Sequence, residues 1–342
     1  MEDVLHDRLQ RLGDVELAIL VSLLSAQHCI FSTTQRAHAD LRTELGYICN
    51  EAFGLQTAVI DCSSKMTVDD FSESLLVDVL DDFEDAQELR DGSGNPTLSV
   101  DFHTTRGSSV NRLGSFSNSL NDRRIADVVI AANLDQASST VQMQALELLR
   151  TKRIFTRTSR HTASKDFLFI VVLSSPGARL SHHLHDLFAM SHFHAEEDGL
   201  PYLDGTMGKD SNVTFSSADI KRLRNSSAEA RITGEIAAYL HNIVVFMRMS
   251  RYVKGGVTAT ATRHLRAVAM ALAPLHGVSY VTPSLITLAA KKVYPHRLVL
   301  ATAETERSLR WGSDPEAVRQ LLQGVTVEDV LEDVIASVET PL

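Results

Sequence analysis

Apolar residues in the first half of the chain fall into short continuous runs that alternate with longer stretches of helical spacing. The central run, residues 125–137, reads Ile-Ala-Asp-Val-Val-Ile-Ala-Ala-Asn-Leu-Asp-Gln-Ala. A continuous apolar run of this kind is typical of a strand buried on both faces, in the middle of a parallel sheet. Similar short runs stand at 29–31, 57–62 and 167–173. Their alternation with helices predicts an α/β domain with a parallel sheet.

Three further segments shape the first half. Helical spacing over 3–25, with a break near Gly13, places a helix before the first strand. Residues 66–89 predict an acidic amphipathic helix, whose carboxylates we expect to face solvent rather than a metal ion. Residues 90–121 are rich in Gly, Ser, Asn and Asp. They predict an irregular insertion, either with a hairpin or as a partly disordered loop.

The pattern of residues in the second half of the chain is different: a polar segment is followed by helical spacing throughout. Residues 199–230 are polar and contain several Gly, Asn and Ser, so they predict a linker. It would join an α/β domain at 1–198 to a helical bundle at 231–342. Thr326 and Asp329 have the spacing of a capping box. The predicted helices of the bundle are 235–252, 262–275, 283–294 and 326–338.

Composition narrows the functional classes. A chain of 342 residues is longer than one average domain, which agrees with two domains. The net charge of −10 argues against a protein that binds a nucleic-acid backbone. The acidic first residues predict no secretory signal, and no apolar run approaches the roughly 18 residues that span a membrane. Three cysteines without C-x-x-C spacing predict reduced core thiols. We therefore expect a cytoplasmic protein.

An acidic residue follows the central strand. Asp135 stands at the carboxyl end of that strand, where open α/β sheets bind ligands. In P-loop ATPases an aspartate here holds the Mg²⁺ shell, and a following glutamate often polarises the attacking water. The next residue in this chain is Gln136, whose amide cannot take a proton at neutral pH.

The turn after the first strand is the place for a phosphate-binding loop. The pattern G-x-x-x-x-G-K-[ST] uses glycines so that backbone N–H groups wrap phosphate, and a lysine for the outer phosphates. Residues 32–45 contain neither glycine nor lysine. We expect Ser32, Thr33 and Thr34 to cap the following helix. A helix N-terminus still favours an anion, but we expect no tight grip on nucleotide.

A group of histidines lies between residues 181 and 194. His182 and His185 would share one face of a helix, and His192 and His194 one face of a strand. Together they could assemble a zinc or nickel site. Because no cysteine or firm ligand motif accompanies them, we expect exposed or hydrogen-bonded histidines instead.

A basic segment precedes the histidines. Residues 154–164 predict a hairpin, and cations stand in it and beside it. A solvated hairpin is the expected interpretation, and a nucleic-acid contact is the alternative. The seven residues concerned are Arg150, Lys152, Arg153, Arg157, Arg160, His161 and Lys165.

Three short motifs in the second half of the chain, called sequence words below, are similar to motifs of a known family. Gly256-Val257-Thr258-Ala259-Thr260 is similar to Gly-x-Ser-Pro-Arg, residues 277–283 to Gly-Arg-x-Tyr-Val-Thr-Pro, and His296-Arg297 to a closing His-Arg pair. With the order of elements, these words resemble the magnesium chelatase ATPase-subunit and MoxR branch of the AAA+ ATPases, over about residues 15–335. The resemblance implies an AAA+-like three-layer αβα parallel-sheet domain, then a small all-α helical lid, and often a ring assembly.

The departures from that family fall on its nucleotide-handling positions. Losing one such group typically reduces a rate by orders of magnitude, so the loss of several is hard to reconcile with ATP turnover. The resemblance places the degenerate catalytic positions at Asp135 and Gln136 (Walker B), Ser175 (sensor), Leu187 (finger) and Thr260 (lid). It places vestigial nucleotide contacts at Ser32, Thr33, Thr34 and Arg263.

Two main functions follow from this combination. The first is a degenerate AAA+ module that acts by binding, as a scaffold subunit, and needs no cofactor. Its partner would be a protein: an active AAA+ subunit, further copies of itself, or a metal-insertion or chaperone complex. The alternative is an active magnesium chelatase-type subunit that uses ATP and Mg²⁺ to drive metal insertion into a porphyrin. We expect no membrane partner and no nucleic acid.

Overall fold

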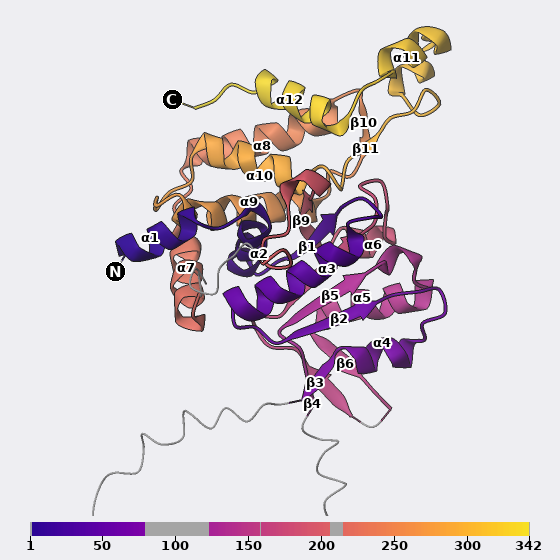
Figure 1. The fold of residues 1–342 in the computed structure, drawn as a ribbon. Coiled ribbons are helices and arrows are strands. Elements are labelled where there is room, and N and C mark those ends of the chain that lie inside the picture. Colours follow the sequence, from indigo (N-terminus) through magenta and orange to yellow (C-terminus); the bar gives the residue numbers. More distant parts are fainter. Residues whose placement is uncertain (1, 79–122, 158, 206–214, 342) are drawn as a thin grey trace, which may run out of the picture.

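Five parallel strands form the central sheet of the protein. A computed structural model describes residues 2–78, 123–157, 159–205 and 215–341. The strand order is β2-β5-β8-β1-β9, so the chain visits one edge before it returns past β1 to the other (Figure 1). All pairs are parallel. The strands are β1 His28–Ser32, β2 Thr57–Asp61, β5 Val128–Ala132, β8 Leu168–Leu173 and β9 Phe188–Phe193.

The three central strands are buried at every position, as their continuous apolar runs predict. Side chains alternate between the two faces of the sheet. Cys29 and Phe31 enter one core, while Ile30 and Val129 enter the other. A layer of helices covers each face, so the predicted three-layer arrangement is confirmed.

The helices of the first half divide between the two faces of the sheet. The first core contains residues of α2 Asp14–Ser25 and α3 His38–Tyr47, and the second contains residues of α4 Val68–Ser74 and α5 Ser139–Thr151. The predicted break near Gly13 is confirmed, and the Ser138 side chain caps α5. The remaining elements are α1 Glu2–Gln10, the π-helical turn Ile48–Ala52, α6 His182–His185, the hairpin β6 Arg153–Phe155 with β7 Arg160–Thr162, and the 3-10 turns Leu134–Gln136 (η2) and Glu196–Asp198 (η3).

One predicted helix is shorter than expected. The acidic helix predicted over 66–89 ends at Ser74, and Leu76–Asp78 forms strand β3, which pairs antiparallel with β4 Arg123–Ile125. A pairing with a distant strand overrides the local helical pattern here. The rest of that predicted helix and the predicted insertion at 90–121 lie outside the described residues.

The C-terminal helices form a lid, and threonines start four of them. Thr233, Thr258, Thr282 and Thr326 each accept a hydrogen bond from a first-turn N–H, and the predicted Thr326–Asp329 capping box is confirmed. No helix of the described residues is long and apolar enough to cross a membrane. The lid elements are α8 Gly234–Met249, β10 Val253–Gly255, α9 Ala259–Leu275, α10 Pro283–Val293, β11 Val299–Leu300, η4 Arg307–Trp311, α11 Pro315–Leu322 and α12 Val327–Ser337.

The segment 199–230, predicted as a linker, contains a packed helix. Helix α7, Ser217–Glu229, lies between α2 and α9 and buries Ile220 and Leu223. Upstream of it, the backbone N–H groups of Tyr202 and Leu203 donate to the carboxylate of Glu44 at 3.0 and 2.8 Å. These contacts fix the segment against the α/β domain.

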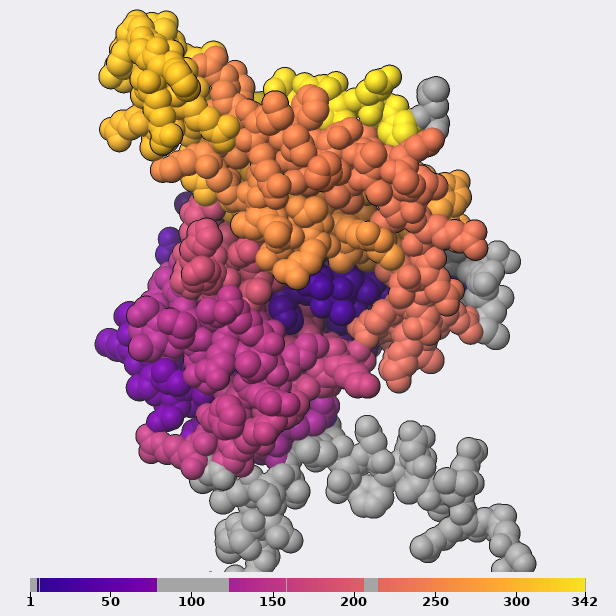
Figure 2. Space-filling model, turned by 180° about the vertical axis from the view of Figure 1, so that it is seen from behind, coloured from indigo at the N-terminus to yellow at the C-terminus, as the bar shows by residue number. Residues whose placement is uncertain are grey.

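The lid and the α/β domain share one hydrophobic core. A continuous cluster of buried side chains runs from α2 and the sheet into α8, α9 and α10. Helices α9 and α10 pack directly against strand β9, and the lid, orange in Figure 2, sits on the α/β domain. Burial of apolar surface stabilises by about 25 cal/mol per Å². Swinging the lid away would therefore expose core and cost free energy.

Candidate functional site

The turn between β1 and α3 is the first candidate site. Helix α3 begins at His38, and its N-cap residue Ala37 provides no side-chain hydrogen bond. The prediction that Ser32, Thr33 and Thr34 cap this helix is wrong. The turn holds three more residues between Thr34 and the helix, so these hydroxyls lie too far back along the chain.

The segment that follows strand β9 accepts hydrogen bonds from two of these hydroxyls instead. Parallel pairing of β1 with β9 brings the end of β9 beside the turn. The Thr33 hydroxyl donates to the His194 carbonyl at 2.8 Å, and the Thr34 hydroxyl donates to the Glu196 carboxylate. Thr33 is fully buried. The chain itself therefore occupies side chains that would otherwise be available to a phosphate or a metal ion.

A histidine stands in the place of the phosphate-loop lysine, which sequence reasoning missed. The eight residues from Ser32 to Ala39 match the length of the G-x-x-x-x-G-K-[ST] pattern, and His38 is the seventh. Its ring is buried, with Nε2 3.1 Å from the Val172 carbonyl. The imidazole thus binds the end of β8 beneath the turn. The cation of the turn is Arg36, which is exposed.

The acidic residue after β5 keeps a free oxygen. Asp135 lies in the 3-10 turn η2, and its Oδ1 is buried without a hydrogen-bond partner in the part of the chain that the structure describes. Gln136 is exposed. The amide of Asn133 donates to Asp61 at 2.9 Å and so links this turn to β2. Such an unpaired carboxylate oxygen fits the shell of a hydrated Mg²⁺, whereas the β1–α3 turn does not fit a triphosphate.

The other positions assigned by resemblance are engaged locally. The Ser175 hydroxyl accepts from the Gly177 N–H at 3.2 Å within its own turn. Leu187 packs against the second core. Arg263 is exposed and donates to the Thr260 hydroxyl, one turn back on the same helix, at 3.3 Å. None of these contacts joins them to the β1–α3 turn.

The histidines have separate partners. His192 is buried with its ring centroid 5.5 Å from that of Phe31, and His194 Nδ1 lies 3.9 Å from the Asp198 carboxylate. His182 is exposed, and His185 contacts the lid. Over the described ranges, no group of three or more His, Cys, Asp or Glu side chains could hold a metal ion.

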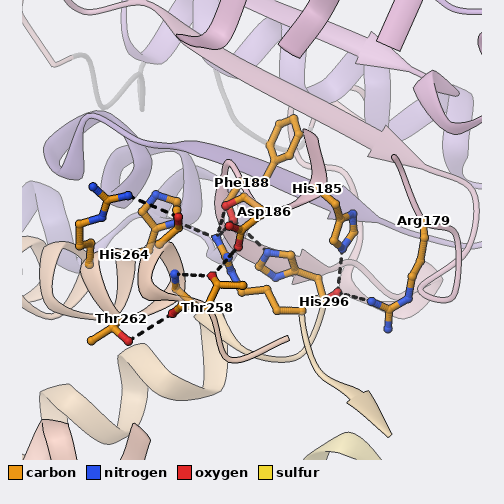
Figure 3. Close-up of polar contacts among 12 residues, drawn as sticks. Arg179, His185, Asp186, Phe188, Thr258, Thr262, His264 and His296 are labelled. Atoms are coloured by element: carbon orange, nitrogen blue, oxygen red, sulfur yellow. Dashed lines mark hydrogen bonds and ion pairs between the residues drawn. The ribbon is translucent and has the colours of Figure 1, made fainter. Parts of the chain in front are cut away.

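Two of the sequence words, 256–260 and 296–297, meet Asp186 between the lid and the α/β domain (Figure 3). Arg297 donates to the Asp186 carboxylate, to the Asp186 carbonyl at 3.0 Å and to the Phe188 carbonyl. The Thr258 hydroxyl donates to the same carboxylate oxygen of Asp186, Oδ1, at 2.7 Å. It also accepts from the Ala261 N–H at 3.0 Å, so the residue that caps α9 also binds the α/β domain.

Two lid histidines complete this network. Arg297 donates to His264 Nδ1 at 2.6 Å, and the His296 ring donates to the Phe188 carbonyl at 3.0 Å. From the α/β domain, His185 donates to the His296 carbonyl at 2.7 Å. We call the side chains of this network the interdomain latch. They are Asp186, Thr258, His264, His296 and Arg297.

The latch requires a neutral imidazole at His264. Burial, followed by the charge of Arg297, lowers the pKa of His264 to about 3. The same two causes, in the same order, lower the pKa of His296 well below its ordinary value. Neutral His264 can accept a hydrogen bond from a guanidinium, whereas an imidazolium cannot. The network therefore fixes the protonation state of His264.

We expect mild acid to weaken the fold partly through His264. Its pKa is about 6.5 in an unfolded chain and about 3 when folded. The unfolded state therefore binds more protons between these values, so the contribution is fully present above pH ~6.5 and is lost as pH falls. Between pH 7 and 5.5 the loss is about 1 kcal/mol. Urea unfolding at both pH values, for the unmodified chain and for His264→Gln, measures it.

The His264→Gln variant should show a smaller loss between the two pH values by that amount. The control is His241→Gln, at an exposed position. This variant should lose as much stability between the two pH values as the unmodified chain does. Equal losses in the unmodified chain and His264→Gln would show that His264 is not held neutral.

Comparisons with known proteins agree with this architecture. A family model described as an AAA lid domain matches residues 245–321. The solved structure of a candidate ATPase from Cytophaga hutchinsonii ATCC 33406 has a TM-score of 0.67, at 13% identity, over 100% of this chain and 97% of that chain. A full-length MCM homolog from Methanopyrus kandleri has a TM-score of 0.48, at 10% identity, over 86% of this chain and 59% of that chain. No curated protein matches the chain in sequence.

The first similarity and the lid match establish the fold. The chain has the AAA+ fold, a parallel α/β domain followed by an AAA lid, as the sequence predicts. At 13% identity, the first similarity does not show that this chain shares the activity of that protein. The TM-score of the second similarity is too low to support an argument. The magnesium chelatase and MoxR branch remains a prediction.

Proposed function

We propose that this chain is an AAA+-type module that acts by binding, as a scaffold subunit of a protein complex, and does not turn over ATP by itself. The β1–α3 turn carries this proposal. It has no glycine, buries His38 in the place of the lysine and engages the hydroxyls of Thr33 and Thr34 with the segment after β9. A P-loop binds phosphate through flexible glycines, a lysine and free hydroxyls.

The lid supports the same proposal. ATP-driven modules couple nucleotide binding to movement of a lid or domain. Here one hydrophobic core and the ion pair between buried Arg297 and half-buried Asp186 join the lid to the α/β domain. A fixed lid suits a module that presents a constant surface to a protein partner. That partner would be an active AAA+ subunit or further copies of this chain, and the proposed role needs no cofactor.

A second candidate function is an active magnesium chelatase-type ATPase subunit. The observation in its favour is Asp135, whose unpaired oxygen fits a hydrated Mg²⁺, together with the exposed Arg36 in the turn. This function would require ATP and Mg²⁺. Its phosphate contacts would have to come from Arg36 and from the backbone of a turn without glycine.

Thermal unfolding in MgATP separates the two functions. We expect no change in Tm at 1 mM MgATP, because the turn offers no tight phosphate site. A ligand at 100 times its Kd would stabilise the fold by about 2.7 kcal/mol. We also expect no phosphate release. Stabilisation that appears with sub-millimolar MgATP, and disappears in both Arg36→Ala and Asp135→Asn, would establish the active alternative.

A further inference from the structure

The tip of the lid exposes large apolar side chains. Trp311, the only tryptophan of the chain, is 88% exposed at the end of η4. Met249 and Phe246, in the last turns of α8, are 70% and 42% exposed. The lobe that contains η4 and α11, yellow in Figure 2, stands clear of the body of the molecule. Exposed apolar groups of this size mark interaction surfaces when they occur together.

Specific contacts hold η4 against the end of α8. Arg307 donates to the Arg248 carbonyl at 3.1 Å. Just before η4, the Glu306 carboxylate is buried and pairs with Arg251 at 3.4 Å. The turn that carries Trp311 is therefore anchored next to the helix end that carries Met249. We call the exposed apolar and basic side chains of these two elements the lid-tip patch. They are Phe246, Arg248, Met249, Arg307, Arg310 and Trp311.

The same two elements that carry the apolar side chains also carry three arginines. Arg248, Arg307 and Arg310 are exposed, and none of them forms an ion pair with a carboxylate in the described part of the chain. The chain as a whole carries a net charge of −10. A local group of exposed arginines without carboxylate partners, on the same two elements as the exposed apolar side chains, thus contrasts with the net charge of the chain. Trp and Arg are also the residues most enriched where binding energy concentrates in protein interfaces.

We propose that the lid-tip patch docks an acidic segment of a protein partner that also carries apolar side chains. The apolar side chains would cover Trp311 and Met249, while its carboxylates would pair with the arginines. A short segment meets only this basic patch. A nucleic acid or an anionic bilayer would extend beyond the patch toward the acidic remainder of the molecule, so a protein segment fits better. The inference rests on the proposed binding function, because it names the surface through which the module binds.

The emission of Trp311 provides a direct test on the full chain. The probe is a synthetic amphipathic helix of Leu, Ala and Glu, and its matched control has Lys in place of every Glu. We expect the acidic peptide, but not the basic one, to shift the tryptophan emission to shorter wavelength in a saturable, salt-sensitive titration. The double variant Arg307→Glu/Arg310→Glu should weaken this binding roughly tenfold. Arg153→Glu, an exposed arginine on the β6–β7 hairpin, should leave it unchanged.

Several results would overturn the proposal. These are no shift at millimolar acidic peptide, an equal shift with the basic peptide, or unchanged affinity in the double variant. A stronger response to phosphatidylserine vesicles or to single-stranded DNA would assign the patch to a phosphate-bearing ligand instead. An emission that moves with protein concentration alone would assign it to a second copy. None of these readouts involves nucleotide, so this test and the MgATP test can fail independently.

Discussion

Replacing Arg297 with alanine should lower the free energy of unfolding by about 3–5 kcal/mol. The side chain is 3% exposed and joins the lid to the Asp186 carboxylate, to two carbonyls and to His264. Removing it leaves a carboxylate facing the lid without its counter-charge and carbonyl oxygens without their donor, and unpaired buried groups are destabilising. Urea unfolding followed by circular dichroism at pH 7 measures the change.

A neighbouring arginine supplies the control. Arg179 donates to the carbonyls of His296 and Leu298 at 2.9 and 3.0 Å, but it is exposed. Arg179→Ala should therefore reduce stability by no more than about 1 kcal/mol. The combination of Arg297→Ala with Asp186→Asn should lose less than the sum of the two single changes, because the second change removes the stranded charge. Strict additivity would contradict a direct Arg297–Asp186 interaction.

The parts of the fold that the sequence predicts depend on local signals. Val128–Ala132 forms a central strand because no polar residue interrupts it, and Thr282 with Pro283 starts α10 because both fit the first helical turn. Strand β3 was missed because Leu76–Asp78 acquires its partner, β4, from residues about 45 positions away. Helix α7 was missed because the polar composition of its segment hides its two buried apolar side chains, Ile220 and Leu223.

The candidate site depends on contacts that a sequence cannot display. The words that contain Thr258 and Arg297 are recognisable separately, but their meeting at Asp186 depends on how the lid packs against β9. The wrong assignment of Thr33 to a helix cap has the same origin, since its true acceptor, His194, is 161 residues away. Placing the eight-residue pattern on Ser32–Ala39 would have drawn attention to its seventh residue, His38.

Replacing Gly256 with alanine should lower the free energy of unfolding by about 3–5 kcal/mol. Its φ of +99° is a conformation that other residues rarely adopt. A Cβ atom there would lie 2.1 Å from the Arg297 carbonyl oxygen and 2.7 Å from the carbonyl carbon. Both are backbone atoms, so the chain at Arg297 would have to move and carry the guanidinium away from Asp186. Urea unfolding measures the loss, and the same variant should add little to Arg297→Ala, because both disrupt the latch.

Two other glycines separate the causes of that loss. Gly312 has a φ of +84°, but a Cβ atom there would have no neighbour within 4 Å, so Gly312→Ala should show the conformational cost alone, about 1–2 kcal/mol. Gly255 has neither a positive φ nor a close neighbour, and Gly255→Ala should change stability by less than about 1 kcal/mol. The excess of Gly256→Ala over Gly312→Ala then measures the contact with Arg297. If the two variants lose equal stability, Gly256 and the backbone at Arg297 do not approach as closely as the structure places them.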